Sequence, residues 1–259
     1  MLKLVKYELK GYYKDFLIMT CAIILLNLFL CFKINDWTNE SIMIANMMIS
    51  FAAYVIVFVW NIKVFSRDIY EDSGYLMFTL SKRGYEILGS KIITCFIQFI
   101  MVFAVSSIIT VLWAELLNVT SGLVLQVRNT IDFISKYSSV KFMIFGLLSV
   151  IVIYTSYLLT GYLAITLSKV AIKNKKFGKI GSFIIFIILV IAQGKIDKVF
   201  QDIFPQTFNI NVVSSGVNSV FINSNANLHI NISSAVLSVT ILIIMFYAVA
   251  YLLENKLDL

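Results

Sequence analysis

Charge is scarce in this chain and proline is almost absent. Only 14% of the 259 residues are Asp, Glu, Lys or Arg, and Pro205 is the one proline. A soluble domain has about 25% charged residues, because its surface must be covered by polar groups. The shortage therefore excludes a water-soluble globular protein. With 60% hydrophobic residues and a mean hydropathy of +0.91, most of the chain must have lipid as its solvent.

Residues that carry enzyme chemistry are equally few. His229 is the only histidine, and the three cysteines, Cys21, Cys31 and Cys95, have no metal-ligand spacing. No phosphate-binding G-x-x-x-x-G-K-[ST] loop and no G-x-S-x-G or H-E-x-x-H motif occurs. We therefore expect no catalytic residue, metal or cofactor on this chain. An intramembrane enzyme would need paired carboxylates, histidines or a serine dyad, so that reading is disfavoured.

Six long uncharged runs predict six transmembrane helices. In lipid every backbone polar group must be paired within its own element, which favours helices over open strands. The runs lack the polar–apolar alternation of membrane β-strands. We therefore predict an all-α membrane protein, a six-helix bundle forming one transmembrane domain over residues 1–259. Its spans are expected at 16–33, 41–65, 91–117, 141–168, 179–194 and 233–253.

The fifth predicted span is short. Its uncharged stretch, 180–194, would measure ~22 Å as a helix, against ~30 Å of hydrocarbon. Two interpretations stay open. Either Lys195 and Lys198 snorkel outward, or the helix stops within the membrane at Gly194 and a re-entrant segment follows. Residues 195–232, which include the Asn-rich stretch 206–232, are predicted to form an outer region.

Lysine and arginine set the expected orientation. With the N-terminus inside, 15 of the 21 basic residues fall on the cytoplasmic side, in 1–15, 63–91, 169–179 and at Lys256. The other six fall outside. This bias predicts a multi-pass plasma-membrane protein with both termini in the cytoplasm. The net charge of +7 reflects the same loops, so it gives no reason to expect nucleic-acid binding.

Two cytoplasmic segments stand out. Residues 1–15 contain LKLVKYELKGYYK, in which Leu2, Val5, Leu9 and either Tyr12 or Tyr13 fall near one helical face. This pattern predicts an amphipathic helix lying in the membrane interface. Residues 66–90 form a long loop that places apolar groups between charges. The loop either docks a partner or packs back on the bundle. The docking residues would be Asp68, Glu71, Asp72, Tyr75, Leu76, Phe78, Lys82 and Arg83.

The same loop carries a family resemblance. Asp68 followed by GYLMFTL and then GYEILGSK, through Lys91, resembles permeases of the ABC-2 type, the membrane subunits of ATP-binding-cassette transporters. The C-terminal YLLENKLDL is also similar to the family's usual ending. One departure is Ser81, where family members often have proline. Ser81 can still cap a helix through its hydroxyl.

The resemblance implies a fold and a set of partners. It implies a cytoplasmic coupling helix in the 66–90 loop that sits in a groove of a separate ATPase subunit, which would hold the ATP and Mg²⁺. It implies a second permease subunit, in a homo- or heterodimer. It also implies short re-entrant helices after the fifth span.

Polar residues within the spans are candidates for a transport pathway. Asn46 and Glu115 are the two we single out. Glu115 either lines the outer part of a pathway or lies at the headgroup level beside Trp113, as in an aromatic belt. Amides such as Asn27, Asn46, Gln98 and Gln193 more often join helices than contact a substrate.

These observations predict an exporter subunit without an ATPase site of its own. Its apolar, neutral spans suit a hydrophobic or amphiphilic cargo such as an antimicrobial peptide, a lipid-like compound or a drug, and both export for resistance and export for secretion stay open. The alternative is a secondary transporter not driven by ATP. Such proteins show internal repeats and intramembrane ionisable residues. The sequence shows no repeat, and Glu115 is the one such residue.

Overall fold

The computed structural model describes residues 2–70, 84–117, 140–171, 175–205, 207–212 and 226–255. Six helices in these residues are long and apolar enough to cross a membrane, which confirms the predicted helical, multi-span character. A two-stranded antiparallel hairpin was not predicted. The elements are α1 (Leu2–Phe32), α2 (Asn39–Tyr70), α4 (Gly84–Leu116), α6 (Val140–Ala171), α7 (Lys175–Ile203), β1 (Thr207–Val212), β2 (Ala226–Asn231) and α8 (Ile232–Asn255).

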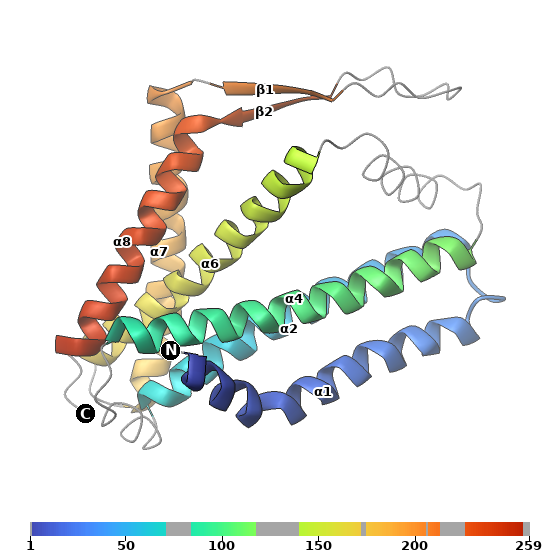
Figure 1. The fold of residues 1–259 in the computed structure, drawn as a ribbon, viewed down its shortest axis with the longest axis horizontal. Coiled ribbons are helices and arrows are strands. Elements are labelled where there is room, and N and C mark those ends of the chain that lie inside the picture. Colours follow the sequence, from blue (N-terminus) through green and yellow to red (C-terminus); the bar gives the residue numbers. More distant parts are fainter. Residues whose placement is uncertain are drawn as a thin grey trace. The chain divides into compact units, whose positions relative to one another are not determined.

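The helices extend beyond the predicted spans. Helix α1 begins at Leu2 and continues without interruption from the predicted N-terminal segment into the first span. Figure 1 shows that α1 bends along its length. Helices α2 and α4 take up 66–70 and 84–90 of the predicted cytoplasmic loop. Its remaining residues, 71–83, lie outside the described part of the chain.

Helix α7 decides between the two interpretations of the fifth span. It continues through Gly194 to Ile203, so the expected stop at Gly194 is wrong. A Cβ at Gly194 would meet nothing within 4 Å, so the glycine imposes no break. The helix ends two residues before Pro205, which cannot continue an α-helix. Strands β1 and β2 follow within the predicted outer region, and Figure 1 shows them at the ends of α7 and α8.

The chain forms two compact units, where the sequence predicted one domain. Unit 1 contains α1, α2 and α4, and each of these helices contacts the other two. One apolar cluster contains Ile23 of α1, Ala53 and Val57 of α2, and Val102 of α4. A second contains Leu30, Ile42 and Trp113, toward the other end of the same helices. From the first cluster to the second, the residue numbers rise along α1 and α4 and fall along α2. Helices α1 and α4 therefore run parallel, and α2 runs antiparallel to them.

Helix α2 begins with a capping interaction. The backbone N–H of Ser41 donates to Thr38 Oγ1 over 3.4 Å, and Glu40 lies in the first turn. A hydroxyl at the N-cap satisfies one of the free N–H groups, and the carboxylate faces the positive end of the helix dipole. The turn between α1 and α2 is therefore specified locally.

Unit 2 contains α6, α7 and α8, with the hairpin. Helix α6 contacts both of the other helices. Its residues Leu159 and Tyr162 are buried, as is Val249 of α8. At the α6–α7 connection, the hydroxyls of Ser168 and Ser182 both donate to the carbonyl of Gly178, over 2.6 and 2.8 Å. This shared acceptor fixes the start of α7 against the end of α6.

Four threonine hydroxyls inside the spans are satisfied within their own helices. Thr20, Thr110, Thr155 and Thr160 each donate to the carbonyl four residues earlier, over 2.7–2.9 Å. In hydrocarbon an unpaired hydroxyl costs several kcal/mol, on the order of 2–7. Back-bonding to the helix therefore lets these polar residues enter apolar segments.

Candidate functional site

A buried charge cluster joins the three helices of unit 1. Lys91 of α4 lies 3.2 Å from Glu8 Oε1 of α1, and it also pairs with Asp68 of α2. The side chains are only 5%, 15% and 13% exposed, respectively. One cation thus bridges two carboxylates from two other helices. We call Glu8, Asp68 and Lys91 the charge cluster.

Neighbouring polar groups extend the charge cluster. Thr94 Oγ1, one turn along α4 from Lys91, donates to Glu8 Oε2 over 2.9 Å. Arg67 donates to the Tyr12 hydroxyl and so makes a further link between α2 and α1. Arg67 itself is exposed, so within the charge cluster Lys91 is the cation that both carboxylates contact.

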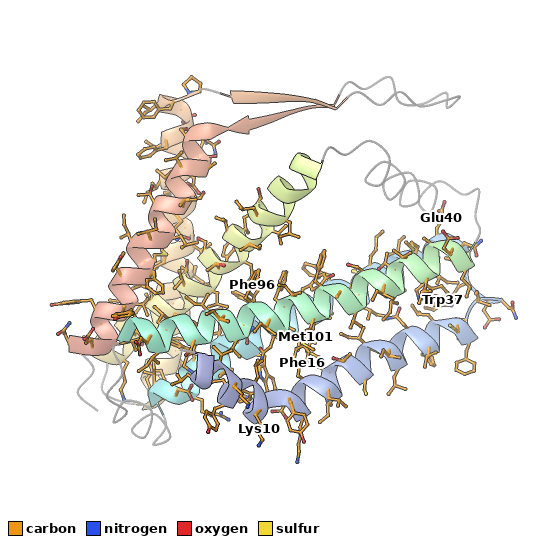
Figure 2. All side chains as sticks on the ribbon, viewed as in Figure 1. Lys10, Phe16, Trp37, Glu40, Phe96 and Met101 are labelled. Carbon is orange, nitrogen blue, oxygen red and sulfur yellow. The ribbon has the colours of Figure 1, made fainter. Side chains whose placement is uncertain are left out.

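The local sequence explains how Glu8 reaches the cluster. Val5, Glu8 and Tyr12 follow a spacing of three and four residues, so they share one face of α1. Val5 is buried and Lys6 and Lys10 are exposed. Glu8 and Tyr12 on this face of α1 therefore meet α4 and α2. Figure 2 shows Lys10 directed away from the bundle.

The structure gives Asp68 a different environment from the predicted docking surface. Its carboxylate pairs with Lys91 inside unit 1. The other seven docking candidates, Glu71, Asp72, Tyr75, Leu76, Phe78, Lys82 and Arg83, lie outside the described residues. Leu88, Ser90 and Lys91, which carry the downstream half of the family resemblance, are all buried. Those motif residues build the core of unit 1.

The two pathway candidates have unlike surroundings. Asn46 is fully buried, and its amide donates to Thr110 Oγ1 of α4 over 3.1 Å. Glu115 is exposed near the end of α4. Trp113, beside which one of the two interpretations placed Glu115, faces the interior of unit 1. The indole is buried, and Nε1 donates to Asn27 Oδ1 over 3.1 Å.

The other amides show the same preference for helix contacts. Asn27 links α1 to α4 through Trp113. Gln193 of α7 meets Thr160 of α6 and the sulfur of Met245 of α8, each over 3.3 Å. These contacts confirm the interpretation of Asn27, Asn46 and Gln193 as groups that join helices.

An apolar groove lies beside the charge cluster in unit 1. Its volume is about 290 Å³, with α1 and α2 as its walls and one residue of α4 exposed to it. Figure 2 shows Phe16 on α1. The lining includes Tyr12, Phe16, Met19, Ala22, Trp60 and Gln98.

Among the described residues, no three metal-ligating side chains gather into one group. Comparisons of the chain with protein-family models, with curated proteins and with solved structures found no match. The geometry of unit 1, with its charge cluster and groove, is therefore the basis for assigning a function.

Proposed function

We propose that the chain is the membrane subunit of an ATP-driven exporter of the ABC-2 type, paired with a second permease subunit and with separate ATPase subunits. The cargo class is hydrophobic or amphiphilic. One observation supports this assignment beyond the sequence resemblance. The charge cluster ties together α1, α2 and α4 close to where the loop 71–83 leaves α2 and returns to α4.

The position of the charge cluster suits a structure that transmits force from the loop 71–83 to the helices. Asp68 lies two residues before the end of α2, and Lys91 lies seven residues after the start of α4. Separating a buried ion pair costs about 3–5 kcal/mol, because each charge loses its partner in a poorly solvated place. A push on the loop would therefore move the ends of the three helices together. A loop that only connected two spans would not need this arrangement.

Substitutions in the loop and in the charge cluster test the proposal separately. Glu71→Lys with Asp72→Lys reverses charge in the loop, and Asp68→Asn breaks the cluster while preserving the shape of the side chain. The ATPase is supplied by co-expressing the chain with ATP-binding subunits from its own genome. Capture of an ATPase by the tagged chain measures docking, and ATP-dependent efflux of a fluorescent amphiphile measures coupling.

We expect the double reversal to abolish capture without lowering the melting temperature. Asp68→Asn should retain capture and reduce efflux. Labelling of cysteines placed at 71–83 from the cytoplasmic side is the topological control. Labelling from the outside, or efflux that persists without any ATPase, would refute the assignment.

The buried carboxylates also favour a second candidate, an ion-coupled secondary transporter. Ionisable groups in poorly solvated places often handle protons, and the side chains of Glu8 and Asp68, which lie in segments predicted to be cytoplasmic, are only 15% and 13% exposed. In that case Glu8→Gln would remove proton dependence of transport in vesicles lacking ATP. The pairing of both carboxylates with Lys91 favours the structural role.

A further inference from the structure

We propose that the groove of unit 1 binds one acyl chain of an anionic phospholipid, with the lipid phosphate at Lys63 and Arg67. This inference goes beyond the proposed function, because lipid binding needs neither ATP nor a partner subunit. It starts from the dimensions of the groove and from the cations at one end.

The groove has the length of one membrane leaflet. Its α1 wall runs from Tyr12 to Ala22, ten residues apart, which is about 15 Å along a helix. Half of a bilayer's hydrocarbon core is also about 15 Å. The volume of about 290 Å³ lies just below the range for ligand sites, which is roughly 300–1,000 Å³. A narrow, leaflet-long cavity fits a single acyl chain.

The two ends of the groove differ in polarity. Met19, Ala22 and Ile56 line the end toward the middle of the helices. Tyr12 and Trp60 line the end nearer the charge cluster. Amphipathic aromatic rings of this kind are enriched where hydrocarbon meets headgroups. The polarity of the groove therefore matches that of a lipid, with an apolar region for the tail and a polar entrance for the headgroup.

Two exposed cations stand at the polar entrance. Lys63 Nζ lies 5.8 Å from the Trp60 ring centroid, and the Arg67 guanidinium carbon lies 5.3 Å from that of Tyr12. Asp15 is the one carboxylate among the lining residues. A lysine ammonium and an arginine fork both bind phosphate through charge-assisted hydrogen bonds.

The two cations at the entrance determine which class of lipid headgroup fits best. A cationic amphiphile would compete with Lys63 and Arg67 for the same aromatic faces and would be repelled by both. A zwitterionic headgroup would bring its own cation to them. An anionic phospholipid presents a phosphate without a compensating ammonium, so it complements the entrance best.

Tryptophan quenching by brominated lipid tests the proposal directly. The full chain is reconstituted in nanodiscs of phosphatidylcholine, with increasing fractions of dibrominated phosphatidylglycerol or dibrominated phosphatidylcholine. The Trp60 signal is the difference between the wild type and Trp60→Phe. Bromine quenches only on contact, so the signal reports occupancy of the groove.

Two pairs of variants separate the tail site from the headgroup site. Ala22→Phe fills the groove, whereas Val59→Phe adds the same ring at an exposed position of α2 that does not line it. Lys63→Gln with Arg67→Gln removes the entrance cations. Lys6→Gln with Lys10→Gln removes two exposed lysines of α1 that do not line the groove.

We expect Trp60 to be quenched at a lower fraction of the brominated anionic lipid than of the zwitterionic one. Ala22→Phe should abolish this quenching, and Val59→Phe should leave it intact. Loss of the entrance cations should weaken anionic-lipid binding by about fivefold for each cation. Lys6→Gln with Lys10→Gln should change the affinity for the anionic lipid by less than half as much.

Three results would overturn the proposal. Equal quenching by both lipids would mean that the headgroup is not recognised. Quenching that survives Ala22→Phe would come from bulk lipid on the outside of the helices. Equal losses in the two lysine and arginine variants would mean a diffuse surface potential rather than a site.

Discussion

Lys91→Met is the sharpest perturbation of unit 1. It keeps the length of the side chain and removes the cation, so that Glu8 and Asp68 lose the one group that pairs with both of them. Removing one partner of a buried ion pair costs about 3–5 kcal/mol. A protein of this size loses about 2–4 °C of melting temperature per kcal/mol. The expected decrease is therefore roughly 6–20 °C.

The chain's own fluorescence provides the assay. All three tryptophans, Trp37, Trp60 and Trp113, belong to unit 1, so their emission on heating reports the unfolding of this unit. Lys33→Met is the matched control, because Lys33 pairs with Asp36 over a similar 3.0 Å but on the surface, with 40% and 63% exposure. A surface pair is worth about 0.2–1 kcal/mol. Its loss should lower the melting temperature by less than about 4 °C.

A neutral triple variant completes the test. Glu8→Gln, Asp68→Asn and Lys91→Met together remove all three charges, and replacing a whole buried ion cluster is often nearly neutral for stability. We therefore expect the triple variant to be more stable than Lys91→Met alone. Equal melting temperatures for Lys91→Met and Lys33→Met would refute the reasoning, as would a triple variant whose losses simply add.

Three further predictions concern groups within the spans. Trp113→Phe leaves Asn27 Oδ1 buried without its donor and should lower the free energy of unfolding by about 1–3 kcal/mol, as measured by thermal melting. Adding Asn27→Leu should restore part of this lost stability. A double-mutant cycle between Asn46 and Thr110 should give about 0.6 kcal/mol of coupling, typical of hydrogen bonds in membranes; a loss of transport at unchanged stability would instead assign Asn46 to the pathway. Gly194→Ala should raise stability by about 0.5–1 kcal/mol, because α7 is helical there and the added methyl group meets open space; a decrease would favour a break at Gly194.

The elements were largely predictable because lipid imposes strict rules on the chain. A helix must pair its own backbone groups and must be about 20 apolar residues long to cross the hydrocarbon. Each of the six uncharged runs therefore predicted a helix that the structure contains. The exception was the end of the fifth span. The predicted span stopped at Gly194, whereas α7 continues through Lys195 and Lys198.

The candidate site was only partly predictable. Asp68 and Lys91 were singled out through the loop motif, but Asp68 was expected to face a partner protein. Glu8 was missed, although a carboxylate on the same face as Val5 and Tyr12 was a usable signal. A buried acid on one helix indicates a cation on another only once the helices are known to pack together.

The sequence by itself determined the solvent of this protein, the number of its helices and their approximate positions, since these follow from hydrophobicity summed along the chain. Only the tertiary structure decided which charges meet. Glu8 and Lys91 are 83 residues apart, and their contact depends on how α1 and α4 are rotated and aligned. The groove depends on the same alignment, because its lining comes from three helices whose separate sequences look equally apolar.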